Sequence, residues 1–247
     1  MFLTFLQFVF IEGHDLDIPT FNSLGYLCTP LEKENIKKNP PHFVHIPKTG
    51  GTSIGEWLKQ DLFSKNHRFY RQTQLKKFTF TFVRNPFDRM HSWYTFCRNI
   101  VMKLEIGDDY CVKSMTMDFN SWIDMVTSRI IRKCGKTACL TQLPCTRNQW
   151  CACLPMENCL GPVTVWIKNF SSVNRSFETD WIGKTENLIN DSFCLSRVLG
   201  IGSGKIDFTH NYLVSSDKKK SHDDYNDTMR KVVRELYDID FRLFYSK

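Results

Sequence analysis

One short stretch of the sequence combines a lysine, two glycines and three hydroxyl side chains. It reads Pro47-Lys48-Thr49-Gly50-Gly51-Thr52-Ser53 and follows an apolar run. Glycines let backbone N–H groups approach a ligand closely, and the first turn of a helix favours an anion. Lys48 adds a positive charge. Further hydrogen-bond donors come from the hydroxyls of Thr49, Thr52 and Ser53. These residues predict a cradle for a phosphate or sulfate group.

The order of residues in this stretch differs from that of the common nucleoside-triphosphate loop. In that motif the lysine follows the glycines, in the order Gly-Lys-[Ser/Thr]. Here Lys48 precedes Gly50 and Gly51. The sequence also lacks a clear acidic strand end for Mg²⁺. A P-loop nucleotide kinase is therefore a disfavoured alternative, which Mg²⁺-dependent binding would support.

Arg84 and Ser92 form a second candidate anion site. Arg84 follows an aromatic and β-branched run, and Ser92 falls in the second turn of the helix expected from Pro86. Arginine offers planar, paired donors to a phosphate, and serine adds one more. The spacing predicts that both side chains reach one anion. Arg89, between them, either approaches that anion or is a solvated or ion-paired helix arginine.

Hydrophobic periodicity predicts the elements that position these residues. Strands are expected at 42–46 and 78–83, each ending just before one of the candidate anion sites. An amphipathic helix follows each strand. The apolar face of the first helix carries Ile54, Trp57, Leu58 and Leu62, and that of the second carries Phe87, Met90, Tyr94, Cys97 and Val101.

The rest of the chain continues the alternation of strands and helices. A helix is expected at 118–131, and a short strand, a glycine turn and a helix start at 181–188. A polar loop at 221–227 leads to a final helix. With 247 residues and 42% hydrophobic residues, the chain is long enough for one sizeable α/β domain.

Several segments, among them the polar loop and final helix of the C-terminal region, resemble the nucleotide-dependent sulfotransferases, especially the membrane-type carbohydrate branch. Pro47–Ser53 resembles their loop for the 5′-phosphosulfate of 3′-phosphoadenosine 5′-phosphosulfate. Arg84–Tyr94 resembles their 3′-phosphate motif, in which a serine follows an arginine by eight residues. Trp181–Leu188 resembles a late Ile-Gly-[Arg/Lys]-x-Glu-Asn-Leu segment. The resemblance covers about residues 42–100 and 180–245.

This resemblance implies the fold, the donor and the roles of the site residues. The implied fold is α/β, with a P-loop-NTPase-like parallel β-sheet flanked by helices and a Cys-rich loop insert. Lys48 and the segment Thr49–Ser53 are expected to hold the 5′ end of the donor, and Arg84 and Ser92 its 3′-phosphate. Lys48 also stabilises the leaving group. The implied acceptor is a carbohydrate hydroxyl on a glycan or glycosaminoglycan-like chain, and no metal is required.

The catalytic base is sought among the histidines and one glutamate. In similar carbohydrate sulfotransferases a histidine lies between the two phosphate motifs, and here His67 does so. Glu56 is the backup. His45 is expected to be structural, and His91 to point to another helix face than Ser92. Lys184, outside this set, is expected either to approach the nucleotide or acceptor or to form a structural salt bridge with an acid.

Cysteines and sequons bear on the compartment. Six of the ten cysteines fall between residues 134 and 159, inside a predicted insert at 134–162. Disulfides are favoured over zinc because the sequence has no Cys-x-x-Cys pair. Four N-glycosylation sequons begin at Asn169, Asn174, Asn190 and Asn226. Together these features favour the secretory pathway, and the resemblance implies the Golgi lumen.

The beginning of the chain has several interpretations. Residues 1–41 are a lead-in, and 42–247 are predicted to form a single domain. The apolar stretch Met1–Ile11 is too short to span a bilayer and lacks a basic n-region. It is a shortened signal, a truncated anchor or a first strand. Membrane association is expected only through such an anchor.

The formal net charge of +7 suits an anionic ligand but does not choose among the classes of partner. Nucleic acid is disfavoured because the basic residues do not gather in one patch interleaved with aromatic residues. A non-catalytic, secreted binder of sulfated or other polyanionic glycans stays an alternative. It explains the charge and the cysteines, but not two anion motifs in this order.

Overall fold

The computed structural model describes residues 41–58, 65–66, 78–104, 109–134, 160–167, 179–201 and 221–246. In these segments the chain forms one parallel sheet of four strands, in the order β2-β1-β3-β4. The strands are β1 (His42–Val44), β2 (Lys65–Asn66), β3 (Thr79–Val83) and β4 (Trp181–Lys184). Every pairing in the sheet is parallel, as predicted.

The register brings the ends of three strands to one edge of the sheet. Val44 pairs with Thr81, and Val83 pairs with Lys184. The Thr81 hydroxyl donates to the Val44 carbonyl oxygen at 2.7 Å. Because the carboxyl ends of parallel strands point the same way, the segments that follow β1, β3 and β4 start side by side.

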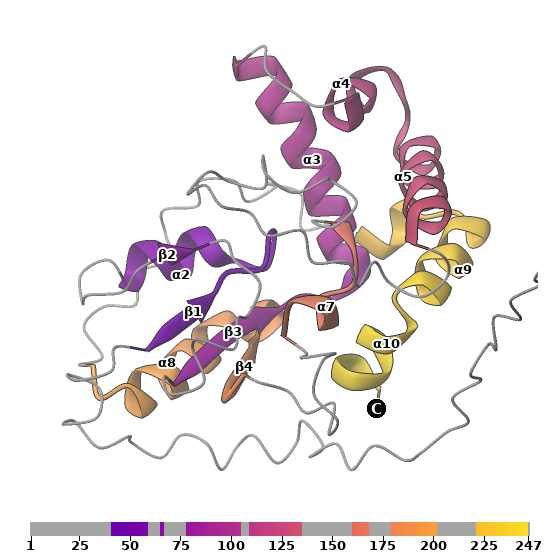
Figure 1. Cartoon of the computed structure of the whole chain (residues 1–247). Helices are drawn as coiled ribbons and strands as arrows, with labels where there is room; N and C mark the ends of the chain where they lie inside the picture. Colours follow the sequence, from indigo (N-terminus) through magenta and orange to yellow (C-terminus); the bar gives the residue numbers. More distant parts are fainter. Residues whose placement is uncertain are drawn as a thin grey trace, which may run out of the picture.

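Helices lie on both sides of this sheet and extend away from it. Figure 1 shows α2 and α8 beside the strands, while α3 rises away from the sheet toward α4, with α5 and α9 next to it. The α-helices are α2 (Gly51–Leu58), α3 (Pro86–Leu104), α4 (Asp109–Thr116), α5 (Phe119–Cys134), α7 (Thr164–Ile167), α8 (Leu188–Val198), α9 (Asp227–Leu236) and α10 (Asp238–Asp240). The 3₁₀-helices are η5 (Thr185–Asn187) and η6 (Ser221–Asp224), and Phe241–Tyr245 forms the π-helix η7.

The sheet separates two hydrophobic cores, because successive side chains of a strand point to opposite faces. On one face, Phe80 and Phe82 of β3 pack with residues of α2 and α8 such as Ile54 and Leu195. On the other face, Val83 packs in a larger core formed mainly by α3, α5, α9 and the segment 160–167. The sheet edge that carries the candidate site therefore has rigid packing on both sides.

The elements differ from the predicted ones in several places, and β2, α4 and α7 were not predicted. The strand β1 ends at Val44, so His45 and Ile46 belong to the following loop. Gly183 lies inside β4 rather than in a turn, and a Cβ there would approach the Phe82 ring to 2.6 Å. The final helix is not continuous, because it divides into α9, α10 and η7.

Three cysteines outside the predicted Cys-rich insert form disulfides. Cys97 of α3 and Cys111 of α4 form a disulfide, and Cys194 is disulfide-bonded as well. Of the predicted insert, only Cys134 and residues 160–162 are described, and the remainder lies outside the described residues. The described segments contain no group of three or more His, Cys, Asp or Glu side chains arranged to hold a metal ion.

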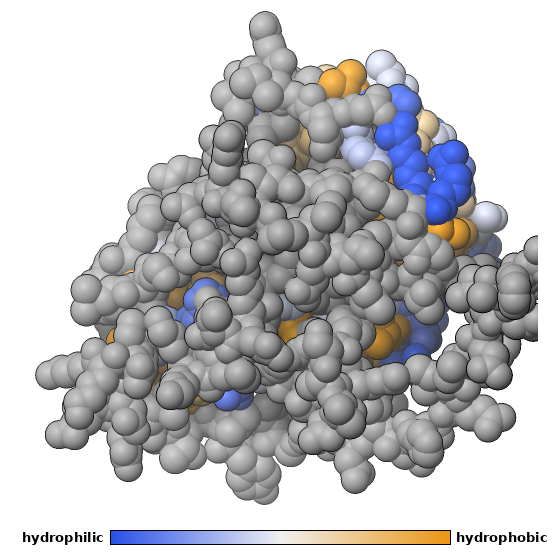
Figure 2. All heavy atoms as spheres, in the orientation of Figure 1, coloured by the Kyte–Doolittle hydropathy of each residue, from blue (hydrophilic) through white to orange (hydrophobic). Residues whose placement is uncertain are grey.

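The surface of the described segments carries few large apolar side chains. Figure 2 shows hydrophilic residues gathered over α5 and its surroundings. The exposed large apolar side chains are Val112 and Met115 on α4, and Ile189 and Phe193 on α8. Within these segments, no helix combines the length and apolar character needed to cross a membrane.

Candidate active site

The loop of residues 45–50 joins β1 to α2 and is here called the Lys48 loop. Lys48 has φ +66° and Gly50 has φ +81°. Glycine adopts such angles freely, whereas a lysine does so only when its surroundings hold it there. Thr49, between them, is fully buried, and its hydroxyl donates to the Ile46 carbonyl oxygen at 2.9 Å. The Thr49 hydroxyl thus braces the loop from inside.

Helix α2 begins directly after this loop. Its first hydrogen bond runs from the Ile54 N–H to the Gly50 carbonyl oxygen, at 3.1 Å. The N–H groups of the preceding residues have no partner within a helix, and they stand at the positive end of the helix dipole. The residues of this first turn are Gly51, the exposed Thr52 and the half-buried Ser53.

The imidazole of His45 explains why residue 51 is a glycine. A Cβ on Gly51 would lie 1.7 Å from His45 Nε2, so no other residue fits without movement. The His45 side chain is 4% exposed and stacks on Phe43 with a centroid distance of 5.4 Å. These contacts agree with a structural role for His45, which stays a prediction.

Arg84 brings the second candidate anion site to the Lys48 loop. It follows Val83, the last residue of β3, and its Nη1 donates to the Lys48 carbonyl oxygen at 3.3 Å. Two motifs that stand 36 residues apart in the sequence therefore meet at one place, as predicted.

Ser92 lies on the face of α3 that contacts the Lys48 loop. Three residues earlier, Arg89 donates through Nε to the Pro47 carbonyl oxygen at 3.1 Å. Four residues later, the centre of the Phe96 ring lies 4.3 Å from the Lys48 ammonium nitrogen. Residues three and four apart share one side of a helix. Ser92 is therefore placed between two side chains that contact the loop.

The charges of this site are unbalanced. Burial, and then the positive charge of Arg84, lower the pKa of Lys48 to about 8. Burial also lowers the pKa of Arg84, while the carboxylates of Asp88 and Glu186 oppose that change. In the described segments, no carboxylate lies within ion-pair distance of the Lys48 ammonium. A dianion bound here would relieve the repulsion between these two cations.

The segment after β4 also contacts the site, next to the Lys48 loop and the segment after β3. The Thr185 hydroxyl donates to the Val83 carbonyl oxygen at 3.0 Å, and a Cβ on Gly50 would lie 3.6 Å from Thr185 Cγ2. Glu186 accepts hydrogen bonds from the Asn85 N–H at 2.5 Å and from the Tyr245 hydroxyl at 3.3 Å. The late segment that resembles the family motif therefore contacts both anion sites.

Comparison with known proteins identifies the family of this chain. A sequence model described as "Sulfotransferase family" matches residues 36–246, which is most of the chain. The chain belongs to the sulfotransferase family. No curated protein and no solved structure matches it. Sulfotransferases move a sulfuryl group to an acceptor and generally use 3′-phosphoadenosine 5′-phosphosulfate, so the resemblance is confirmed at the level of the family.

The two candidate bases of this sulfotransferase are not placed. His67 lies outside the described residues. Glu56 is part of α2, but its side chain lies outside what the structure describes. Their roles stay predictions.

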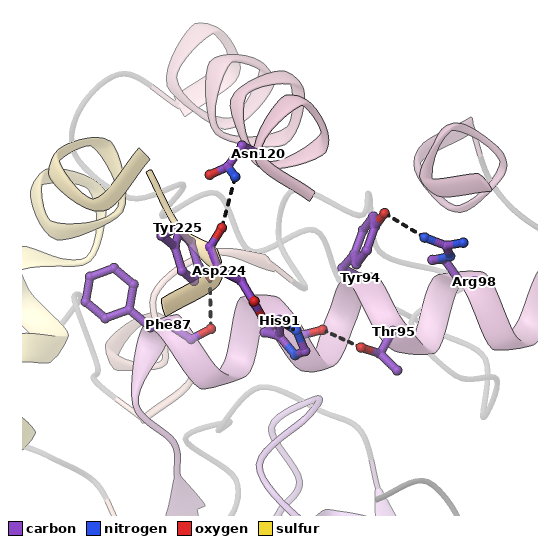
Figure 3. Close-up of polar contacts among 8 residues, drawn as sticks. All are labelled: Phe87, His91, Tyr94, Thr95, Arg98, Asn120, Asp224 and Tyr225. Carbon is purple, nitrogen blue, oxygen red and sulfur yellow. Dashed lines mark hydrogen bonds and ion pairs between the residues drawn. The ribbon is translucent and has the colours of Figure 1, made fainter. Parts of the chain in front are cut away.

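The position of His91 agrees with its prediction. Its Nε2 lies 3.1 Å from Asp224 Oδ2 in η6, and Asn120 of α5 donates to the Asp224 carbonyl oxygen at 2.9 Å. Figure 3 shows these contacts on the side of α3 that faces η6 and α5. His91 thus joins helices, whereas Ser92 faces the Lys48 loop of the sulfotransferase.

Lys184 has two kinds of contact in this site. Its backbone N–H donates to Asp191 Oδ2 at 2.6 Å, and its ammonium group lies 5.1 Å from the centre of the Tyr245 ring. Burial, and then the negative charge of Glu186, raise the pKa of Tyr245, so its phenol stays protonated and can donate to that carboxylate. Contact of Lys184 with a ligand stays a prediction.

Three side chains of the site were missed or misassigned from the sequence. Arg89 is 1% exposed and bonds two backbone carbonyls, so it is not a solvated arginine. Phe96 and Glu186 received no role. The spacing of Arg89 and Phe96 from Ser92 is the one sequence feature that could have placed them on the site face. Glu186 could have been found only through contacts between distant segments.

Proposed function

We propose that this sulfotransferase transfers the sulfuryl group of 3′-phosphoadenosine 5′-phosphosulfate to a carbohydrate hydroxyl in the Golgi lumen. The observation that supports this donor is the adjacency of two cations, Lys48 and Arg84. Burial lowers the pKa of both, and the charge of Arg84 lowers the pKa of Lys48 further. A site that gathers positive charge in this way favours a ligand with several negative charges.

The two anion sites suit a ligand that has a phosphate at each end. In the proposal, the backbone N–H groups from Gly50 to Ser53 hold the 5′-phosphate at the positive end of α2. Arg84 and Ser92 hold the 3′-phosphate, since both lie next to the Lys48 loop and outside the first turn of α2. The Thr52 and Ser53 hydroxyls add donors on the open side of that turn.

The proposed reaction is an in-line displacement at sulfur. The acceptor hydroxyl oxygen forms the new S–O bond, the bond from sulfur to the 5′-phosphate oxygen breaks, and the hydroxyl proton goes to a base. The Lys48 ammonium stabilises the charge that gathers on the leaving oxygen. We assign the base to His67, with Glu56 as the second candidate.

The acceptor class and the compartment are inferred from the net charge, the disulfide and the sequons. The formal net charge of +7 suits a polyanionic glycan. The disulfide between Cys97 and Cys111 and the four sequons favour an oxidising, secretory compartment. A non-catalytic glycan binder has the same charge and cysteines, and membership of a transferase family speaks against it.

A transfer assay with labelled donor across a panel of glycans tests the proposal. We expect transfer to at least one glycan by the wild-type protein, and loss of transfer in Lys48→Ala with little change in melting temperature. Lys231→Ala, at an exposed position of α9, is the matched control and should keep full turnover.

Measurements of bisphosphate binding and of sulfuryl transfer test the donor, the acceptor class and the mechanism separately. We expect 3′,5′-adenosine bisphosphate to raise the melting temperature of the wild-type protein. An unchanged melting temperature would contradict the proposed donor. Bisphosphate binding without transfer to any glycan would contradict the acceptor class. Normal turnover in Lys48→Ala would contradict the mechanism, and normal turnover in His67→Ala would move the base to Glu56 or to another group.

A further inference from the structure

Arg89 connects the Lys48 loop to a segment from a distant part of the chain. Its Nε donates to the Pro47 carbonyl oxygen at 3.1 Å, and its Nη1 donates to the Gly161 carbonyl oxygen at 2.6 Å. The side chain is 1% exposed. A buried guanidinium that reaches two backbone carbonyls holds both segments in a fixed relation, because its donors lie in one rigid plane.

The contact with Pro47 bears on the backbone conformation of Lys48. The Pro47 carbonyl belongs to the peptide group that precedes Lys48, and the Lys48 carbonyl belongs to the one that follows. Arg89 holds the first carbonyl and Arg84 holds the second. These two peptide planes set φ and ψ of Lys48, whose φ of +66° is unfavourable for a side chain with a Cβ.

The far end of the Arg89 contact is itself held by buried polar groups. The Tyr237 hydroxyl donates to the Leu160 carbonyl oxygen. The Asp240 carboxylate accepts from the N–H groups of Val163 and Thr164, at 2.7 and 3.0 Å. Both side chains are fully buried. The segment Leu160–Ile167 is therefore a fixed support for Arg89.

We propose that Arg89 is a positioning residue, which sets the conformation of Lys48 by anchoring the Lys48 loop to the Leu160–Gly161 backbone. Its effect on turnover rests on the proposed function, whereas its effect on the Lys48 side chain does not. Losing the Pro47 contact frees the first peptide plane, and the Lys48 ammonium then leaves its place above Phe96.

The test compares three variants on α3. Arg89→Lys keeps the charge but lacks the fork that reaches two carbonyls, and Arg89→Met removes the charge. Arg98→Met is the matched control, because Arg98 is exposed on the same helix and its Nη1 donates to the Tyr94 hydroxyl. The primary measurement is the rate of amine modification at Lys48 against pH, followed by mass spectrometry of its peptide.

In the wild-type protein and in Arg98→Met, we expect the pH midpoint of Lys48 modification to be about 8. In both Arg89 variants it should rise toward the ordinary lysine value of 10.5, because the amine reaches solvent. We also expect the turnover number to fall at least about tenfold while the KM for the donor changes less. A folded Arg89→Lys protein with the wild-type midpoint would overturn the proposal.

A second pair of variants keeps the test decisive if the Arg89 variants do not fold. Tyr237→Phe removes the hydroxyl that holds the Leu160 carbonyl, so the midpoint should rise by a smaller amount. Tyr225→Phe removes the hydroxyl of another buried tyrosine, which donates to the Phe87 carbonyl oxygen at 2.9 Å, and it should leave the midpoint unchanged. Equal midpoints in the two variants would overturn the proposal. Failure of the wild-type protein to bind the bisphosphate would contradict the proposed function alone.

Discussion

Lys48 keeps its ammonium group where the protein disfavours charge. The change of its pKa from 10.5 to about 8 corresponds to roughly 3 kcal/mol against the charged form. The cation–π contact with the Phe96 ring stabilises the charged form by only about 0.5–2 kcal/mol. The folded protein therefore carries an electrostatic cost at Lys48 that a bound anion can offset.

The sign of this effect on stability follows from proton linkage. Between pH 8 and 10.5 the unfolded chain binds more protons at Lys48 than the folded protein does. Stability therefore rises with pH across this window, and the cost is fully present below about pH 8. An anion that binds near Lys48 raises its pKa again, so binding and protonation are coupled.

This coupling predicts that bisphosphate binding takes up protons at pH 8. Phosphate groups are already deprotonated at that pH, so the uptake reports on Lys48. Calorimetry in buffers of different ionisation enthalpy measures the uptake, and the affinity should fall as the pH rises above 8. Lys48→Met should abolish the uptake. An enthalpy independent of the buffer in the wild-type protein would contradict the prediction.

At the scale of elements, the two glycines of the Lys48 loop serve different purposes. Gly50 has φ +81° and ordinary space around its Cα. Gly51 has no room for a Cβ, because the His45 ring occupies that place. The first glycine lets the chain turn, and the second lets the start of α2 approach β1.

This difference predicts an energetic coupling between residues 45 and 51. Gly51→Ala should destabilise the protein by about 1–3 kcal/mol and weaken bisphosphate binding, because the methyl group displaces the imidazole. His45→Ala removes the obstacle, so Gly51→Ala should cost less in that background. A double-mutant cycle in urea measures the coupling, and additive free energies would show that the two residues act independently.

Local patterns predicted the elements better than the contacts between them. The run 78–83 and the stripe after Pro86 appear as β3 and α3 nearly as expected, because alternation and helical spacing follow from burial. Contacts between carbonyls and distant side chains leave no such pattern. Arg89 reaches Pro47 and Gly161 only after folding, so its role was not visible in the sequence.

At the scale of the whole molecule, the site lies on a sheet edge between two cores. The core around Phe80 holds α2 from one side, and the core around Met90 holds α3 from the other. Lys48, on the loop between β1 and α2, meets α3 at Phe96. The geometry of the anion site therefore depends on how the larger core keeps α3 in place.

The disulfide between Cys97 and Cys111 is one constraint on that core. Both residues are buried, and they join α3 to α4 across 14 residues of chain. Cys97 was predicted as an apolar member of the α3 stripe, and its bond was not apparent because cysteine packs like a small hydrophobic residue. Closing a loop of this size stabilises a protein by about 3 kcal/mol in the chain-entropy model.

We therefore predict that Cys97→Ala lowers the melting temperature by about 6–12 °C. Cys111→Ala and the double variant should lower it by nearly the same amount, since one bond is lost in every case. The smaller part of each change comes from the lost side-chain packing. Thermal unfolding of the three variants measures these changes, and thiol counting by mass spectrometry confirms the free cysteine. Additive losses, with the double variant falling about twice as far, would show that packing rather than the bond stabilises this region.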